Sequence, residues 1–119
     1  MKVAVTTAGN DANADVDPRF GRVKNLLIFD TETGEHEILD NSANLGATQG
    51  AGIQTAKRVA ESGAEALITG HCGPNAFRTL EAAGIQVITG VEGRISDALT
   101  RFQEGSLKPA NGADVQGHW

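Results

Sequence analysis

The chain alternates between short apolar runs and longer stretches in which apolar positions repeat with helical spacing. The apolar runs of strand length are residues 2–7, 26–30, 37–40, 66–69 and 85–89. A short polar segment containing Gly34 joins the second run to the third, which is typical of an antiparallel hairpin. The pattern therefore predicts a buried first strand, an early hairpin and two later strands.

Helices are predicted at residues 47–62, 74–83 and 94–103. Pro74 suits a first helical turn because its fixed φ is already helical and its missing N–H costs nothing there. The third helix has the clearest pattern, since its apolar side chains repeat at i, i+3, i+4 and i+7: Ile95, Ala98, Leu99 and Phe102. The strands and helices of the second half indicate consecutive βα units.

Two of these βα units resemble each other. Residues 68–73 (ITGHCG) and residues 88–93 (ITGVEG) share the order strand, glycine turn, helix. In a right-handed βαβ unit both turns lie at the carboxyl ends of parallel strands, on one edge of the sheet. The turn after the first strand joins them if that strand is parallel to the other two. Open α/β sheets bind ligands at such an edge, so we expect the functional site there.

Composition narrows the class of protein. The chain has 119 residues, a net charge of −5, one cysteine and no tyrosine. This length predicts one domain, and a single cysteine allows no internal disulfide and favours a reducing compartment. An acidic chain with few aromatic residues is a poor nucleic-acid binder. The apolar runs are too short for a signal peptide or a membrane helix, so we expect a cytoplasmic protein without a membrane partner.

The first candidate for chemistry is the turn Gly70-His71-Cys72-Gly73. An imidazole and a thiol lie side by side there, just before a helix whose N-terminus would attract an anion. The ordinary alternatives are a buried cysteine, which is the commoner role for a lone Cys, and a loop histidine. Two ligands do not complete a structural zinc or iron–sulfur site, so any metal must bring most of its own ligands.

The second candidate is the segment 17–22 (DPRFGR), followed by Lys24. It concentrates cations in an acidic chain, so Arg19 and Arg22 could meet an anionic ligand as part of a lid over the site. The alternative is a tight turn in which Phe20 is a hydrophobic anchor and the charges lie in water. We expect the long polar loop around this segment to be mobile without a ligand.

Acidic side chains lie before this segment and at its first position. Asp11, Asp15 and Asp17 could form a magnesium-binding group, but the first strand contributes no carboxylate beside them. Solvation of the loop is therefore the favoured role for these carboxylates.

With these motifs and this element order, the chain resembles the dinitrogenase iron–molybdenum cofactor biosynthesis family. That family includes small carriers of nitrogenase cofactor precursors and a molybdenum–copper sulfide "orange" protein. The likeness covers residues 1–104, and residues 105–119 are expected to form a flexible tail. The resemblance implies an α/β, ribonuclease-H-like three-layer fold with a five-stranded mixed sheet, order 3-2-1-4-5, flanked by helices.

The resemblance also implies a function. It points to a carrier that binds an anionic metal–sulfur cluster, of the iron or molybdenum–iron type, in metallocluster assembly. The expected partners are metallocluster donor or acceptor proteins, and the expected state is a monomer or weak dimer. Carried onto this chain, the expected metal ligands are His71 and Cys72. The expected cofactor-binding residues are Arg19, Phe20, Arg22, Gly70, Gly73 and Asn75.

Two other function classes stay open at the level of sequence. One is a small thiol or phosphoryl-transfer enzyme that uses Cys72 with His71, or the acidic loop residues. It is weakened because the sequence suggests no third member of a catalytic triad and no carboxylate on a strand. The other is a regulatory interaction module without a cofactor, whose loops bind a protein.

Overall fold

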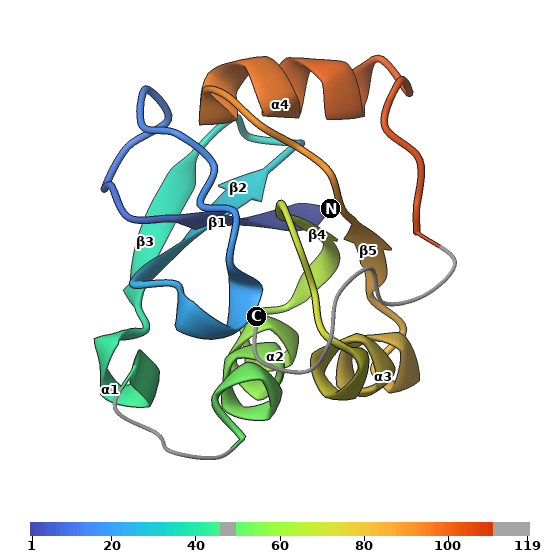
Figure 1. The fold of residues 1–119 in the computed structure, drawn as a ribbon. Helices are drawn as coiled ribbons and strands as arrows, with labels where there is room; N and C mark the ends of the chain where they lie inside the picture. Colours follow the sequence, from blue (N-terminus) through green and yellow to red (C-terminus); the bar gives the residue numbers. More distant parts are fainter. Residues whose placement is uncertain (46–49, 111–119) are drawn as a thin grey trace.

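The structure, a computed structural model, describes residues 1–45 and 50–110. It has three layers: a central sheet with α4 on one side and α2 and α3 on the other (Figure 1). The elements in chain order are β1 (Lys2–Thr7), η1 (Phe20–Arg22), β2 (Asn25–Asp30), β3 (His36–Asp40), α1 (Ser42–Leu45), α2 (Ala51–Glu61), β4 (Ala64–Ile68), α3 (Pro74–Ala82), β5 (Gln86–Ile88) and α4 (Ile95–Gln103).

The sheet has five strands in the order β3-β2-β1-β4-β5. β2 pairs antiparallel with β1 and with β3, whereas β1 pairs parallel with β4 and β4 with β5. This confirms the expected mixed sheet, with β1 central and β3 at an edge. Because β1, β3, β4 and β5 run in the same direction, their carboxyl ends share one edge of the sheet.

Each face of the sheet has its own apolar cluster, because successive side chains of a strand point to opposite faces. On β1, Ala4 joins the cluster under α2 and α3, whereas Val3 and Val5 join the cluster under α4. The amphipathic helices supply the other half of each cluster, Val59 and Leu80 on one side and Leu99 on the other. Burial of these apolar side chains is what holds the layers together.

Several element boundaries differ from the predicted ones. The helix predicted at 47–62 is observed as α2, which begins at Ala51 after Gly50 in the left-handed region with φ 73°. Residues 47–49 of that prediction lie outside the described residues. The separate α1 was missed because four residues are too short for a periodic pattern. The strand predicted at 66–69 is observed as β4, and it begins two residues earlier, directly after the turn that ends α2.

Two segments predicted to be mobile or flexible make defined contacts among the described residues. The loop after β1 is held at its middle, where the Val16 amide donates to Gly93 O at 2.8 Å and the Asp17 amide to Thr6 O at 2.7 Å. At the other end of the chain, the Ala110 amide donates to Val87 O of β5 at 2.7 Å. The predicted tail from residue 111 onward lies outside the described residues. Within the described part of the chain, no helix is both long and apolar enough to cross a membrane.

Candidate functional site

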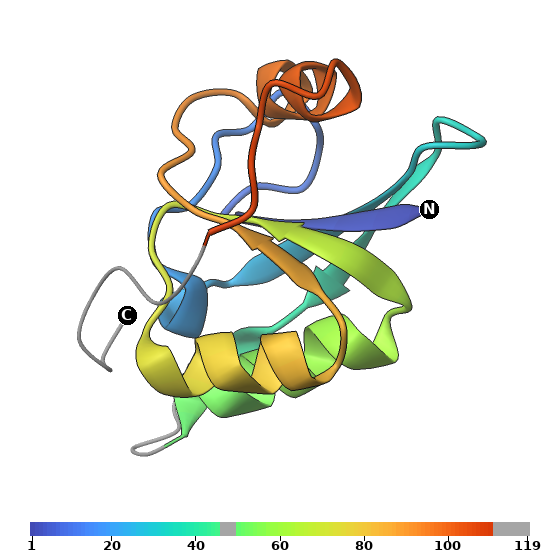
Figure 2. The same ribbon diagram turned by 90° about the vertical axis from the view of Figure 1, so that its right-hand side faces the viewer.

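Loops after β1, β4 and β5 meet at the carboxyl edge of the sheet, on the side opposite the tip of the β2–β3 hairpin (Figure 2). Backbone hydrogen bonds join them. The His71 amide donates to Pro18 O at 2.8 Å, and the Phe20 amide donates to His71 O at 3.3 Å. The Gly90 amide then donates to Gly70 O at 2.7 Å. The two sequence motifs, the DPRFGR segment and the Gly70–Gly73 turn, are therefore neighbours in space.

Gly70 allows this close approach. A Cβ atom at Gly70 would lie 2.6 Å from Pro18 Cα and 2.9 Å from Pro18 O, closer than real Cβ atoms come. Both obstructing atoms belong to the backbone, so a rotamer change cannot relieve the contact. Gly90 and Gly93 have a different role, since they adopt φ of 74° and 91°.

Buried hydroxyl groups support the loops from beneath, and sequence reasoning missed them. The Thr6 and Thr69 side chains are fully buried, and their Oγ1 atoms lie 2.9 Å apart. The Thr6 hydroxyl also lies 2.7 Å from Asp17 O and donates to it. A signal was present, because both threonines lie at the end of a predicted apolar run: Thr69 is the last residue of 66–69 and Thr6 the second-last residue of 2–7. Such polar residues must find partners once they are buried.

The adjacent residues His71 and Cys72 lie in different surroundings. The His71 side chain is half-buried at the edge, whereas Cys72 is fully buried in the apolar cluster under α2 and α3. The Cys72 Sγ lies 3.7 Å from Gly73 O. Of the two predicted metal ligands, His71 is therefore the one that a solute can reach in this conformation.

The DPRFGR segment likewise contains both buried and exposed residues. Phe20 and Gly21 are buried, and Phe20 belongs to the same core cluster as Cys72. Arg19 and Arg22 are exposed on either side of this anchor. The Arg19 amide donates to Asp17 Oδ1 at 2.9 Å, which fixes the turn that begins the segment. Phe20 thus has the anchoring role that the sequence left open, and it presents both guanidinium groups to solvent.

The N-terminus of α3 lies directly after the Gly70–Gly73 turn. Pro74 occupies its first turn, Gly73 is its N-cap with φ −76°, and no side chain in the described part of the chain caps this end. Asn75 is exposed, and its Oδ1 accepts a hydrogen bond from Arg78 Nη2. Arg78 is a further exposed cation near this helix start, and the sequence motifs gave no reason to select it.

A second helix N-terminus lies beside the first. α2 also begins at the carboxyl edge of the sheet, and a Cβ atom at Gly52 would lie 3.3 Å from Ala76 Cβ in α3. The N-cap of α2 is Gly50, and among the described residues no side chain caps this helix. Because helix N-termini carry partial positive charge and unbonded N–H groups, this pair favours an anion. Sequence reasoning missed the pair, because the contact between Gly52 and Ala76 depends on how the helices pack.

The acidic residues of the loop after β1 hold its turns. Asp11 Oδ1 accepts from the Asn13 amide at 2.9 Å, and Asp15 forms an isolated backbone bridge with Arg94. No group of three or more His, Cys, Asp or Glu side chains among the described residues could hold a metal ion. The exposed cations Arg19, Arg22 and Arg78 and the half-buried His71 are therefore the groups that these loops and the start of α3 offer to a ligand.

The sequence is similar to those of known proteins. The sequence model of the family described as dinitrogenase iron-molybdenum cofactor matches residues 1–105. The chain belongs to this family. It is 32% identical over 111 residues to an uncharacterised protein of Methanocaldococcus jannaschii, an alignment that covers 91% of this chain and 90% of that one.

Solved structures agree with this assignment. The fold is similar to the apo form of the orange protein from Desulfovibrio gigas, with a TM-score of 0.94, 41% identity and coverage of 96% of both chains. A Thermotoga protein of the DUF35 family is also similar, with a TM-score of 0.83, 33% identity and coverage of 98% of both chains. Membership of the dinitrogenase cofactor family confirms the resemblance that the two motifs indicated.

Proposed function

We propose that this chain is a non-enzymatic carrier of an anionic metal–sulfur cluster, with the cluster as its cargo. The observation that carries the proposal is the backbone bridge between Arg19 and His71. This bridge joins the exposed guanidinium segment to the half-buried imidazole, next to the N-termini of α2 and α3. Positive charge, unbonded helix N–H groups and one metal ligand are thus available within a single surface.

The donor set suits a cluster that arrives assembled. A sulfide cluster already holds most of its ligands and carries negative charge. It therefore needs a cationic cradle and one displaceable bond, which Arg19, Arg22 and His71 can supply. Cys72 is buried in the core, so we assign the direct bond to His71 and a packing role to Cys72. Incomplete ligation also lets a carrier release its cargo to a second protein.

The comparisons support the same reading. The description of the family names the iron-molybdenum cofactor of dinitrogenase. The structure of the orange protein is that of its apo form, a term used for a protein without its bound group. We propose that the partners of this chain are proteins that donate or accept a metallocluster. A thiol enzyme is the weaker candidate, because a nucleophilic cysteine must be reachable and Cys72 is fully buried.

Anaerobic reconstitution tests the proposal. The protein is titrated with iron or molybdenum in the presence of sulfide, and binding is followed by the absorption spectrum and by metal analysis. We expect His71→Ala to weaken binding at least about tenfold, which corresponds to about 1.4 kcal/mol. His36→Ala is the matched control, since His36 is exposed on β3, away from the loops. Equal affinity for both variants would remove His71 from the site.

The contribution of the two arginines to binding should depend on salt concentration. Arg19→Gln and Arg22→Gln should each weaken binding more at low salt than at high salt, because they remove charge and leave the metal bond intact. Arg101→Gln, on the exposed end of α4, is the control and should leave binding unchanged. A loss that does not depend on salt would argue against an electrostatic role for the DPRFGR segment.

A further inference from the structure

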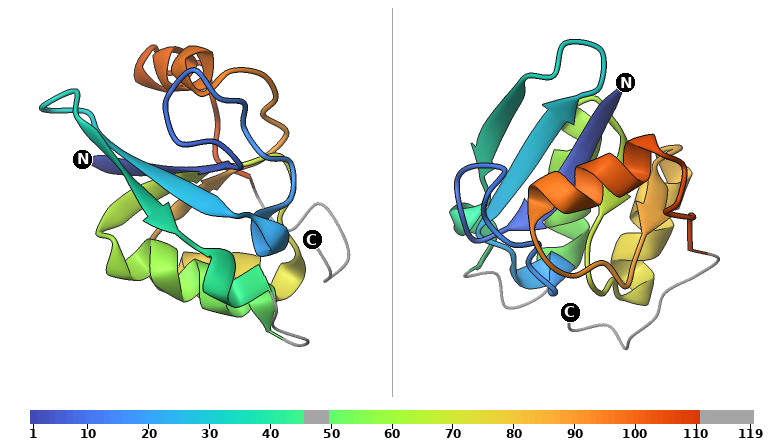
Figure 3. Two further views of the ribbon diagram at one scale, coloured as in Figure 1. Left: turned by 90° about the vertical axis from the view of Figure 1, so that its left-hand side faces the viewer. Right: turned by 90° about the horizontal axis from the view of Figure 1, so that it is seen from above.

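The two edges of the sheet differ in how their backbone groups are used. The outer edge of β5 is bonded by the chain itself, through the Ala110 amide and Val87 O at 2.7 Å. β3 forms the other edge, and it is the leftmost strand of the sheet in the right view of Figure 3. Among the described residues, no backbone group bonds the outer side of β3.

The register identifies which groups of β3 point outward. The Asp30 amide donates to Glu35 O at 2.9 Å and the Asn41 amide donates to Lys24 O at 2.7 Å, at the two ends of the pairing between β2 and β3. Hydrogen-bonded pairs alternate along an antiparallel ladder, so Glu37 and Leu39 bond β2. The N–H and C=O groups of His36, Ile38 and Asp40 therefore point away from the sheet, as a template for another strand.

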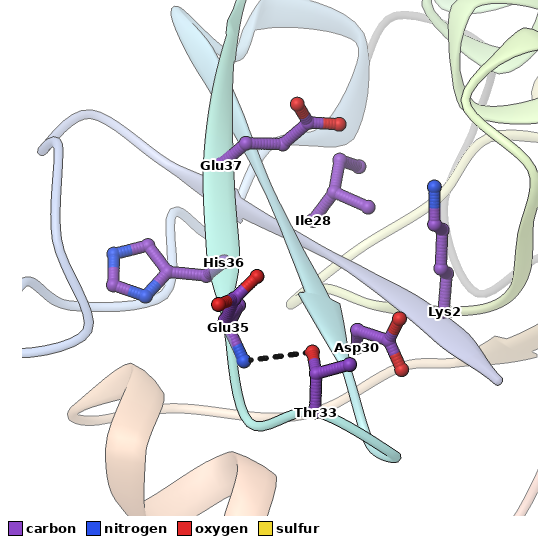
Figure 4. Close-up of a pocket in the computed structure, with 7 residues that line it drawn as sticks. All are labelled: Lys2, Ile28, Asp30, Thr33, Glu35, His36 and Glu37. Carbon is purple, nitrogen blue, oxygen red and sulfur yellow. Dashed lines mark hydrogen bonds between the residues drawn. The ribbon is translucent and has the colours of Figure 1, made fainter.

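An acidic pocket of about 230 Å³ lies beside this edge. Figure 4 shows Glu37 on the same side of β3 as Ile28 and Lys2, with His36 on the opposite side. The pocket holds one ammonium group, that of Lys2, and three carboxylates. Its lining residues are Lys2, Ile28, Asp30, Thr33, Glu35, His36 and Glu37. Within the described residues, the ion pair found within 4 Å is that of the N-terminal amine with Glu32, so Lys2 forms no direct ion pair with these carboxylates.

We propose that the outer edge of β3 binds an extended basic segment of a partner protein as an added strand. Backbone hydrogen bonds to His36, Ile38 and Asp40 would supply affinity. A lysine or arginine side chain of the segment, entering the pocket beside Glu37, would supply specificity. A second copy of this chain is a poorer occupant, because pairing β3 with itself brings two acidic edges together.

The position of this edge matters for a carrier. The pocket contains Lys2, at the start of β1, whereas the loops that contain Arg19 and His71 lie at the carboxyl ends of the strands. A partner strand on β3 would leave those loops open. The inference rests on the β3 edge and its pocket, so it stands or falls independently of the proposed cluster binding.

The test uses the full chain and two short peptides, one of alternating valine and lysine and one of alternating valine and glutamate. Binding is followed by backbone amide chemical shifts. We expect the lysine peptide to shift the amides of His36, Ile38 and Asp40, and to bind at least about tenfold more tightly than the glutamate peptide at low salt. Equal binding of the two peptides, or shifts confined to other elements, would overturn the proposal.

Variants of β3 separate backbone pairing from charge. Ile38→Pro removes an outward donor and no bond to β2, so it should abolish peptide binding while the protein stays folded. Glu37→Lys reverses one pocket charge and should weaken the lysine peptide at least about tenfold. Glu81→Lys makes the same change on the exposed face of α3 and should have no effect.

If the lysine peptide binds Glu37→Lys as tightly as it binds the parent, the inference is overturned. If Ile38→Pro does not fold, Glu37→Lys alone provides the test. Sedimentation of the free protein checks the other occupant. Self-association that Ile38→Pro abolishes would replace the partner strand with a second copy of the chain.

Discussion

At the scale of single residues, the proposed site depends on Gly70, because there is no room for a side chain at this position. We expect Gly70→Ala to destabilise the fold by about 1–3 kcal/mol, because the new methyl group would meet the Pro18 backbone at 2.6 Å. Cluster binding should fall with it, since the contact aligns Arg19 with His71. Denaturant unfolding measures the first effect and anaerobic titration the second.

A second substitution identifies the cause. Adding Pro18→Ala to Gly70→Ala should not restore stability, because the nearest atoms are Pro18 Cα and O and remain after the ring is removed. Recovery of the parent stability in the double variant would mean that the proline ring alone causes the conflict. An unchanged free energy of unfolding in Gly70→Ala would show that the loops can separate freely.

Substitution of Cys72 tests whether its side chain packs in the core or binds the metal. We expect Cys72→Ser to lower the free energy of unfolding by about 1–3 kcal/mol, because it buries a hydroxyl group in an apolar cluster. Cys72→Ala keeps the site apolar and should cost less. Neither variant should weaken cluster binding beyond what the loss of stability explains. A large loss of affinity in Cys72→Ala, with the fold intact, would restore the thiol as a ligand.

Asp40 gives the fold a dependence on pH. Hydrogen bonds from the side chain and the backbone amide of Ser42, the latter at 2.8 Å, hold the pKa of Asp40 below its ordinary value of 3.8, and Lys24 and Arg58 add to this. A lowered pKa means that the stabilisation is present above pH 3.8 and is lost as the pH falls through the folded-state value. The parent should therefore be more stable than Asp40→Asn near neutral pH, and the two unfolding curves should converge in acid. A difference that persists at low pH would contradict this.

At the scale of elements, the loop after β1 is where the sequence was least informative. Amide hydrogen exchange tests its state in the protein without cargo. We expect slow exchange at Val16 and Asp17, whose amides bond Gly93 O and Thr6 O, and fast exchange at the exposed Asp11. Exchange at Val16 and Asp17 as fast as in an unfolded peptide would support the mobile loop predicted from composition.

The regular elements were predictable because their signals are local. Two short apolar runs and the polar segment around Gly34 gave the hairpin, and the repeat of apolar positions from Ile95 gave α4. The loop after β1 lacks such a pattern, since its amides bond residues distant in sequence, as Val16 bonds Gly93. The start of α2 was placed too early, because Gly50 interrupts the chain in a conformation that periodicity does not detect.

At the scale of the whole molecule, parallel strand direction accounts for what could be foreseen of the site. Two βα units and a parallel first strand bring their loops to one edge, and the structure joins those loops through Gly70 and Gly90. The sequence left open whether each motif divides into a buried and an exposed member, because neighbouring residues in a turn point in unrelated directions. The α2 and α3 N-termini likewise meet only after packing, at Gly52.

Mapping the cluster on the intact protein tests the central claim most directly. Backbone amide spectra are recorded anaerobically before and after addition of iron or molybdenum with sulfide. We expect amides of residues 18–22 and 70–76 to shift or broaden first, together with Gly50 and Gly52 at the start of α2. Amides of β3 and α4 should remain unchanged. Perturbation confined to β3 or α4, with the loops at Arg19 and His71 unaffected, would contradict the proposed site.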